Sequence, residues 1–97
     1  MTLRPGAYEK YKVAHDEVWP ELAAGMRANQ VSMAIYRDGE RLFLFAVAPS
    51  EDHWHRSRQD PVLTRWDARM TEFLEINEQG AIAFTVLSKA FGFGEFK

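Results

Sequence analysis

The 97-residue sequence contains no cysteine, so the chain can form no disulfide, thiolate nucleophile or cysteine-ligated metal site. This composition fits a reducing cytoplasm. No apolar run approaches the roughly 18 residues of a membrane-spanning helix, and the N-terminus lacks an apolar signal segment. The net charge is −2 with both signs interspersed, which argues against a nucleic-acid or anionic-membrane surface. We therefore expect a soluble cytoplasmic protein.

The composition that is present is typical of a folded globular chain. Apolar residues make up 46% of the sequence and charged residues 27%, which excludes a disordered chain. At this length the chain forms one domain, which we assign to residues 1–97.

The most informative segment carries a histidine and a tyrosine one helical turn apart. Helical periodicity extends over residues 7–29, with a kink expected at Pro20 because proline lacks a backbone donor. Tyr11 and His15 share one face of this helix. The same stripe continues through Leu22, which we expect to be buried. An imidazole beside a phenol on an inward helix face suits proton transfer to a small polar ligand.

The remainder of the chain alternates between strand and helix patterns. The predicted elements are a short extended segment at 1–4, strands at 31–37 and 42–48 joined by a turn at 38–40, helices beginning after Ser50 and Asp60, and a last strand at 81–87. This order is β-α-β-β-α-β, the ferredoxin-like split motif of the α+β class. It predicts a four-stranded antiparallel sheet with both helical layers on one face.

The second predicted strand has no polar face. Residues 42–48 alternate between two apolar rows, whereas a sheet face that meets water should be polar. An uncovered apolar sheet face is an interface or a liability. We therefore expect a homodimer that packs sheet against sheet, as a dimeric α/β barrel.

Other conspicuous residues favour structural interpretations. His53 and His55 lie two apart and point to different helix faces, with no carboxylate pattern to complete a metal site. We expect no metal. Trp19 is expected to fix the kink. Three arginines are expected to form a solvated face, with the alternative that one of them hydrogen-bonds a ligand hydroxyl; they are Arg56, Arg58 and Arg65.

Several motifs together resemble the L-rhamnose mutarotase family. The resemblance rests on Arg4-Pro5-Gly6, Tyr11, the run His15-Asp16-Glu17-Val18-Trp19-Pro20-Glu21-Leu22, Ala34-Ile35-Tyr36, and Trp66 with Met70. It covers roughly residues 3 to 76. The histidine-containing run is its most specific part, because the tyrosine precedes it by the spacing that the family shows.

The resemblance implies a fold, an activity and a set of site residues. Family members are small dimeric α/β barrels that interconvert the α and β anomers of L-rhamnose without a metal or organic cofactor. It implies that His15 is the general acid and that Tyr11 and Trp66 bind the sugar. At two substrate-binding positions this chain departs from the family: Met33 replaces a tyrosine, and Asp67 replaces a second tryptophan.

The sequence thus favours an isomerase, an aldose 1-epimerase acting on L-rhamnose or a close 6-deoxy sugar such as L-fucose. Tyr36 is a further candidate for contact with the sugar, although strand tyrosines commonly pack across a sheet. Two alternatives stay open on the same architecture. One is a cofactor-free monooxygenase, and the other is a ligand-binding module without catalysis.

Overall fold

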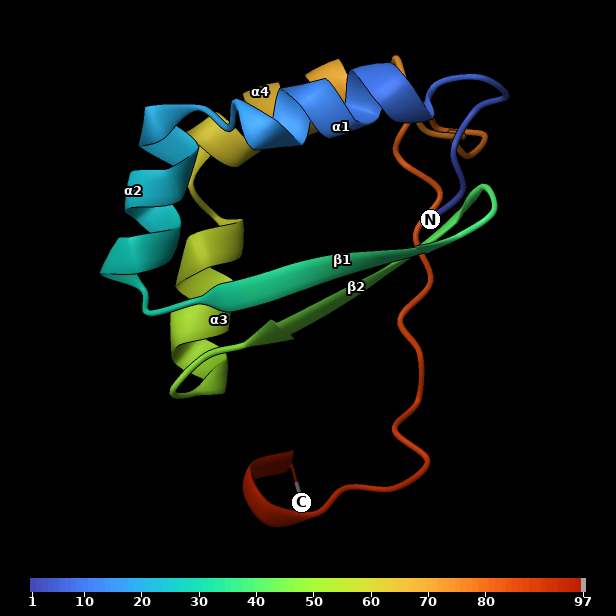
Figure 1. Ribbon diagram of the computed structural model, residues 1–97. Helices are drawn as coiled ribbons and strands as arrows, with labels where there is room; N and C mark the ends of the chain where they lie inside the picture. Colours follow the sequence, from blue (N-terminus) through green and yellow to red (C-terminus); the bar gives the residue numbers. More distant parts are fainter. Residues whose placement is uncertain (97) are drawn as a thin grey trace.

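The computed structural model describes residues 1–96 and consists of helices packed on one face of a β-hairpin (Figure 1). Helices α1 and α4 lie side by side over the hairpin, and α2 and α3 stand at one end of it. Among residues 1–96, no helix is long and apolar enough to cross a membrane. The elements in chain order are α1 (Tyr8–Asp16), α2 (Pro20–Ala28), β1 (Ser32–Asp38), β2 (Arg41–Val47), α3 (Glu51–Arg58), α4 (Pro61–Met70) and the 3-10 turn η1 (Gly94–Phe96).

The first helical region is broken in two, which corrects the expectation of one kinked helix over residues 7–29. Helix α1 ends at Asp16, and Trp19 has extended backbone angles of φ −58° and ψ 133°. A residue that precedes proline is forced out of the helical region, so Trp19 cannot continue the helix. Pro20 then begins α2, where its missing N–H costs nothing.

The hairpin confirms the predicted pairing and turn. Strands β1 and β2 are antiparallel, with Tyr36 opposite Phe43, and Gly39 occupies the turn at φ +61°. Alternation along β2 turns Leu42 inward, where it is 3% exposed, while Phe45 points outward and is 50% exposed. The outer face of the hairpin is therefore apolar and largely exposed, as the sequence predicted.

The N-terminal segment lies between β2 and the chain that follows α4. Thr2 bridges Arg41 on one side, and Leu3 bridges Leu74 on the other, each as an isolated antiparallel pair. The Leu3 amide donates to the Glu40 carbonyl at 2.7 Å. This arrangement is compatible with a ferredoxin-like α+β fold, although the regular sheet has two strands within the described residues.

The last strand expected at 81–87 is wrong. In the part of the chain that the structure describes, this segment forms one isolated bridge, between Ile82 and Ile76. The Ala83 amide donates to the Glu75 carbonyl there, and the Asn77 amide donates to the Ala81 carbonyl. Leu74 already pairs with Leu3, so residues 81–87 cannot pair with the N-terminal segment and instead pair with the residues that follow Leu74. With no helix packed on it, the segment stays irregular and extends away from the helices (Figure 1).

Side-chain caps begin α3 and α4 where the sequence predicted them. Ser50 Oγ accepts a hydrogen bond from the His53 amide at 3.2 Å, and Asp60 Oδ1 accepts one from the Val62 amide at 3.0 Å. Helix α4 then turns its apolar stripe into the core. The buried hydrophobic residues are Leu3, Tyr11, Ala14, Leu22, Leu42, Val62, Leu63, Trp66, Met70, Phe73 and Leu74.

Replacing Leu74 tests whether the short pairing with the N-terminal segment stabilises the fold. Leu74 is 1% exposed, so Leu74→Ala should lower the free energy of unfolding by about 2–5 kcal/mol through lost burial and a residual cavity. Urea denaturation measures this change. Leu87→Ala is the matched control, because Leu87 is 69% exposed and its truncation should change stability by less than about 0.5 kcal/mol. Equal effects for the two variants would contradict the placement of Leu74 in the core.

Candidate functional site

A cavity of about 100 Å³ lies between the helices and the inner face of the hairpin. Its walls are largely apolar, with Met33 and Ile35 from β1 and Leu44 from β2. Such a site, mostly apolar with a few polar groups, is typical of small-molecule binding. The side chains that bring polar groups to the lining are Tyr11, His15, Arg58, Trp66 and Asp67.

His15 is held in one tautomer by the backbone of its own helix. Its Nδ1 lies 3.0 Å from the Tyr11 carbonyl oxygen. A carbonyl only accepts hydrogen bonds, so Nδ1 carries the proton and Nε2 keeps its lone pair. Burial lowers the pKa of His15 below its ordinary value of 6.5, while the hydrogen bond to Tyr11 and the nearby Asp16 charge partly oppose that shift. The imidazole is therefore a neutral base at neutral pH.

Tyr11 supplies a neutral hydroxyl next to this base. Its ring centroid lies 4.1 Å from that of His15, and the residue is 5% exposed. Burial raises the pKa of Tyr11 to about 12, so the phenol keeps its proton and can donate a hydrogen bond. The helical spacing predicted this juxtaposition.

Trp66 connects α4 to α1 and forms part of the cavity wall. The indole meets His15 edge-on at 5.2 Å between ring centroids, and it meets Trp19 in the same way at 5.2 Å. Trp66 is 6% exposed, so one ring both packs the core and faces the cavity. Trp19 packs on Trp66 and is absent from the cavity lining described within residues 1–96.

The structure brings most of the sequence-predicted residues together. Met33 and Asp67 line the same cavity as His15. Tyr36 does not, because alternation along β1 places it on the opposite sheet face, where it is 65% exposed. Nothing brings Tyr36 near the imidazole within one copy of the chain.

The site also contains an arginine that the sequence did not distinguish from its neighbours. Arg58 was expected on a solvated face with Arg56 and Arg65, but it is half-buried and lines the cavity. Its guanidinium carbon lies 4.4 Å from the ring centroid of Trp54, one helical turn earlier. That four-residue spacing between tryptophan and arginine was the available signal, since it puts the two side chains on one face of α3.

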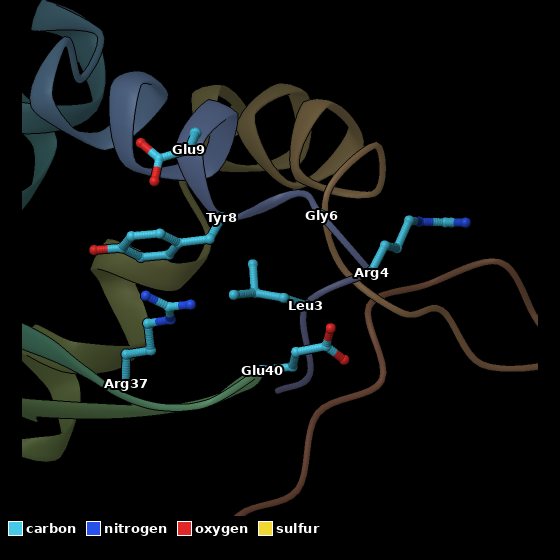
Figure 2. Close-up of a pocket in the computed structure, with 7 residues that line it drawn as sticks. All are labelled: Leu3, Arg4, Gly6, Tyr8, Glu9, Arg37 and Glu40. Carbon is cyan, nitrogen blue, oxygen red and sulfur yellow. The ribbon is translucent and has the colours of Figure 1, made fainter.

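A second hollow, of about 210 Å³, lies between the N-terminal segment, the start of α1 and the hairpin turn (Figure 2). Its cations are already engaged: the Arg37 guanidinium carbon lies 3.7 Å from the Tyr8 ring centroid, and Arg4 Nε donates to the Leu74 carbonyl at 3.0 Å. Figure 2 shows the end of the Arg4 side chain directed away from Tyr8 and Arg37. Unlike the cavity beside His15, this hollow has no histidine among its lining residues.

A metal site is not assembled from the residues described. Within residues 1–96, no three imidazole and carboxylate groups converge to hold a metal ion. His53 Nδ1 instead lies 2.7 Å from Ser50 Oγ, within the cap of α3.

The protonation state of His15 is directly measurable. We expect NMR titration of its ring to give a midpoint below 6.5, with the proton on Nδ1 in the neutral form. Because the folded-state pKa is lowered, the unfolded chain binds a proton more readily, so His15 should destabilise the fold as pH falls through this range. A midpoint above 6.5, or a proton on Nε2, would contradict the burial and the hydrogen bond described here.

Comparisons with known proteins agree on one family. The sequence pattern described as L-rhamnose mutarotase matches residues 1–91. An L-rhamnose mutarotase of Escherichia coli O8 (strain IAI1) is 33% identical over 94 residues, covering 94% of this chain and 90% of the relative. The L-rhamnose mutarotase of Shigella flexneri gives the same values. That of Escherichia coli K12 is 32% identical over the same shares.

Proposed function

The chain belongs to the L-rhamnose mutarotase family, and we propose that it is an isomerase that interconverts the α and β anomers of L-rhamnose by proton transfer through His15. A close 6-deoxy sugar such as L-fucose is the second candidate substrate. The observation that carries the proposal is the neutral imidazole, fixed with Nδ1 protonated, on the wall of a small cavity.

The chemistry needs only a proton acceptor that can also return the proton. Nε2 of His15 takes the proton from the anomeric hydroxyl O1 while the bond between C1 and the ring oxygen O5 breaks, giving an aldehyde. The imidazolium then gives the proton to O5, which has become an alkoxide. O1 and O5 are both bonded to C1, so one nitrogen can serve both atoms. Rotation about C1–C2 and the reverse sequence yield the other anomer.

The neighbouring residues have supporting roles in this proposal. Tyr11 donates a hydrogen bond to a sugar oxygen, since its phenol stays protonated. Trp66 gives an apolar surface for the sugar ring. Met33 and Asp67 complete the lining, and Tyr36 has no contact with the sugar within one copy.

The two alternatives are not favoured. A cofactor-free monooxygenase on the same fold makes no use of the family motif around His15, and a binding module without catalysis does not need a neutral base facing its cavity. Both alternatives predict that the wild type does not accelerate anomer exchange, and the binding module also predicts that replacing His15 changes no sugar-dependent activity.

His15→Asn should lower the rate of anomer exchange of L-rhamnose by about 10²–10⁴-fold, the usual contribution of general acid–base catalysis. Asparagine can still donate to the Tyr11 carbonyl, so the fold should survive. Saturation-transfer NMR between the α and β signals measures the rate. His55→Asn, on an exposed position of α3, is the matched control and should exchange at the wild-type rate. Exchange by His15→Asn at the wild-type rate would exclude His15 as the proton carrier.

We also propose that the chain works as a homodimer in which the sheets of the two copies pack face to face as an α/β barrel. The outer hairpin face supports this, because Tyr36, Phe43, Phe45 and Val47 are all exposed there. Phe96 covers a part of it, with its ring centroid 5.5 Å from that of Phe45. A cytoplasmic location, expected from the sequence, belongs to the same proposal.

Phe45→Glu tests the sheet face as the dimer interface. A charge in the centre of an apolar interface should raise the dimer dissociation constant by more than about tenfold, since interface energy concentrates in central aromatic side chains. Sedimentation velocity over a concentration series measures the constant. Val13→Glu places the same charge on an exposed apolar position of α1 and should leave the dimer intact. A monomeric wild type, or dissociation by Val13→Glu alone, would overturn this assignment.

A further inference from the structure

The cavity beside His15 contains a buried cationic donor without a partner. Arg58 Nε is inaccessible to solvent and has no hydrogen-bond partner among residues 1–96. Its guanidinium stacks on Trp54, which fixes its position. An arginine in a protein cannot remove this deficit by losing its proton. Buried donors in native structures are nearly always paired, and a ligand bound in the cavity would supply the partner that Arg58 lacks.

A carboxylate of opposite charge lines the same cavity. Asp67 follows Trp66 on α4 and is exposed as a residue, at the rim of the site. In the described part of the chain, Arg58 and Asp67 form no direct ion pair. The charges still attract each other, but burial dominates: it lowers the pKa of Arg58 and raises the pKa of Asp67. Arg58 Nε therefore has unused hydrogen-bonding capacity, and a carboxylate that attracts its charge lines the same cavity.

The two charges together define the chemistry of the ligand. Arg58 only donates hydrogen bonds, and ionised Asp67 only accepts them. A hydroxyl group can do both, so a ligand with adjacent hydroxyls satisfies the pair at once. A carboxylate ligand would be attracted by Arg58 but repelled by Asp67. The pair thus matches an uncharged polyol better than a sugar acid.

We propose that Arg58 and Asp67 bind ring hydroxyls of the sugar and determine which sugar the cavity accepts. The proposal rests on the proposed mutarotase function, and it assigns Arg58 a role in substrate recognition. The acid–base chemistry belongs to His15, so the pair contributes binding and orientation.

The test uses a sugar analogue that binds but cannot react. In 1,5-anhydro-L-rhamnitol the anomeric hydroxyl is absent, so its ring cannot open. Its dissociation constant, measured by NMR titration of the Trp66 indole signal, should rise about tenfold in Arg58→Gln and in Asp67→Asn, as expected for the loss of a hydrogen bond to a charged group. Arg65→Gln, an exposed arginine on α4, is the matched control and should stay within twofold.

Deoxy analogues locate the contact without relying on any variant. Among the 2-, 3- and 4-deoxy forms of the analogue, at least one should bind the wild type about tenfold more weakly, because a charged partner is then left unsatisfied. Arg58→Gln or Asp67→Asn should no longer distinguish that form from the parent compound. If Arg58 and Asp67 only stabilised the fold, their replacement would leave the difference in affinity between the parent and the deoxy form unchanged.

The failures of the two proposals are separable. Anomer exchange of free L-rhamnose tests the mutarotase function, whereas binding of the unreactive analogue tests the hydroxyl contacts. The inference is overturned if the wild type does not bind the analogue, or binds all deoxy forms as tightly as the parent. It is also overturned if folded Arg58→Gln and Asp67→Asn bind the analogue like the wild type.

Discussion

The site depends on one contact: the packing of Trp66 against His15 on α1 and against Trp19, which lies between α1 and α2. The indole meets His15 and Trp19 edge-on, at 5.2 Å in each case, and so joins α4 to the first helical region. Large aromatic rings in such arrangements gain burial and a favourable quadrupole geometry. Since His15 is also bonded to the Tyr11 carbonyl, its ring is constrained on two sides. The same contacts that close the core thus aim the imidazole at the cavity.

Local features of the fold could be predicted from the sequence, whereas sheet partners could not. The caps at Ser50 and Asp60 and the shared face of Tyr11 and His15 follow from short-range geometry. The break at Pro20 is also local, but a proline at the first turn begins a helix as readily as it kinks one. The choice between Leu74 and residues 81–87 as neighbour of Leu3 is non-local, and both segments are apolar, so composition could not decide it.

The site shows the same division. Sequence spacing identified His15 and Tyr11, and the family resemblance added Trp66, Met33 and Asp67; all five line one cavity. Arg58 could not be distinguished from Arg56 and Arg65, because an arginine in a charged helix is solvated in most proteins and only the tertiary position of α3 turns it inward. For Tyr36 the sequence already held the answer, since strand alternation puts Tyr36 and Met33 on different faces of the sheet.

Two opposing effects set the pKa of His15: burial lowers it, and the hydrogen bond to the Tyr11 carbonyl raises it. Burial lowers the pKa of the imidazole. The ring therefore stays neutral and able to accept a proton, but its protonated form is destabilised. A general base works best when its pKa lies near the working pH, so burial alone would weaken it. The Tyr11 carbonyl accepts a hydrogen bond from Nδ1–H in both protonation states of the ring, and this bond is stronger when the ring is charged. It therefore restores proton affinity at Nε2 while it fixes the tautomer, so a single hydrogen bond supplies both properties that reversible proton transfer requires.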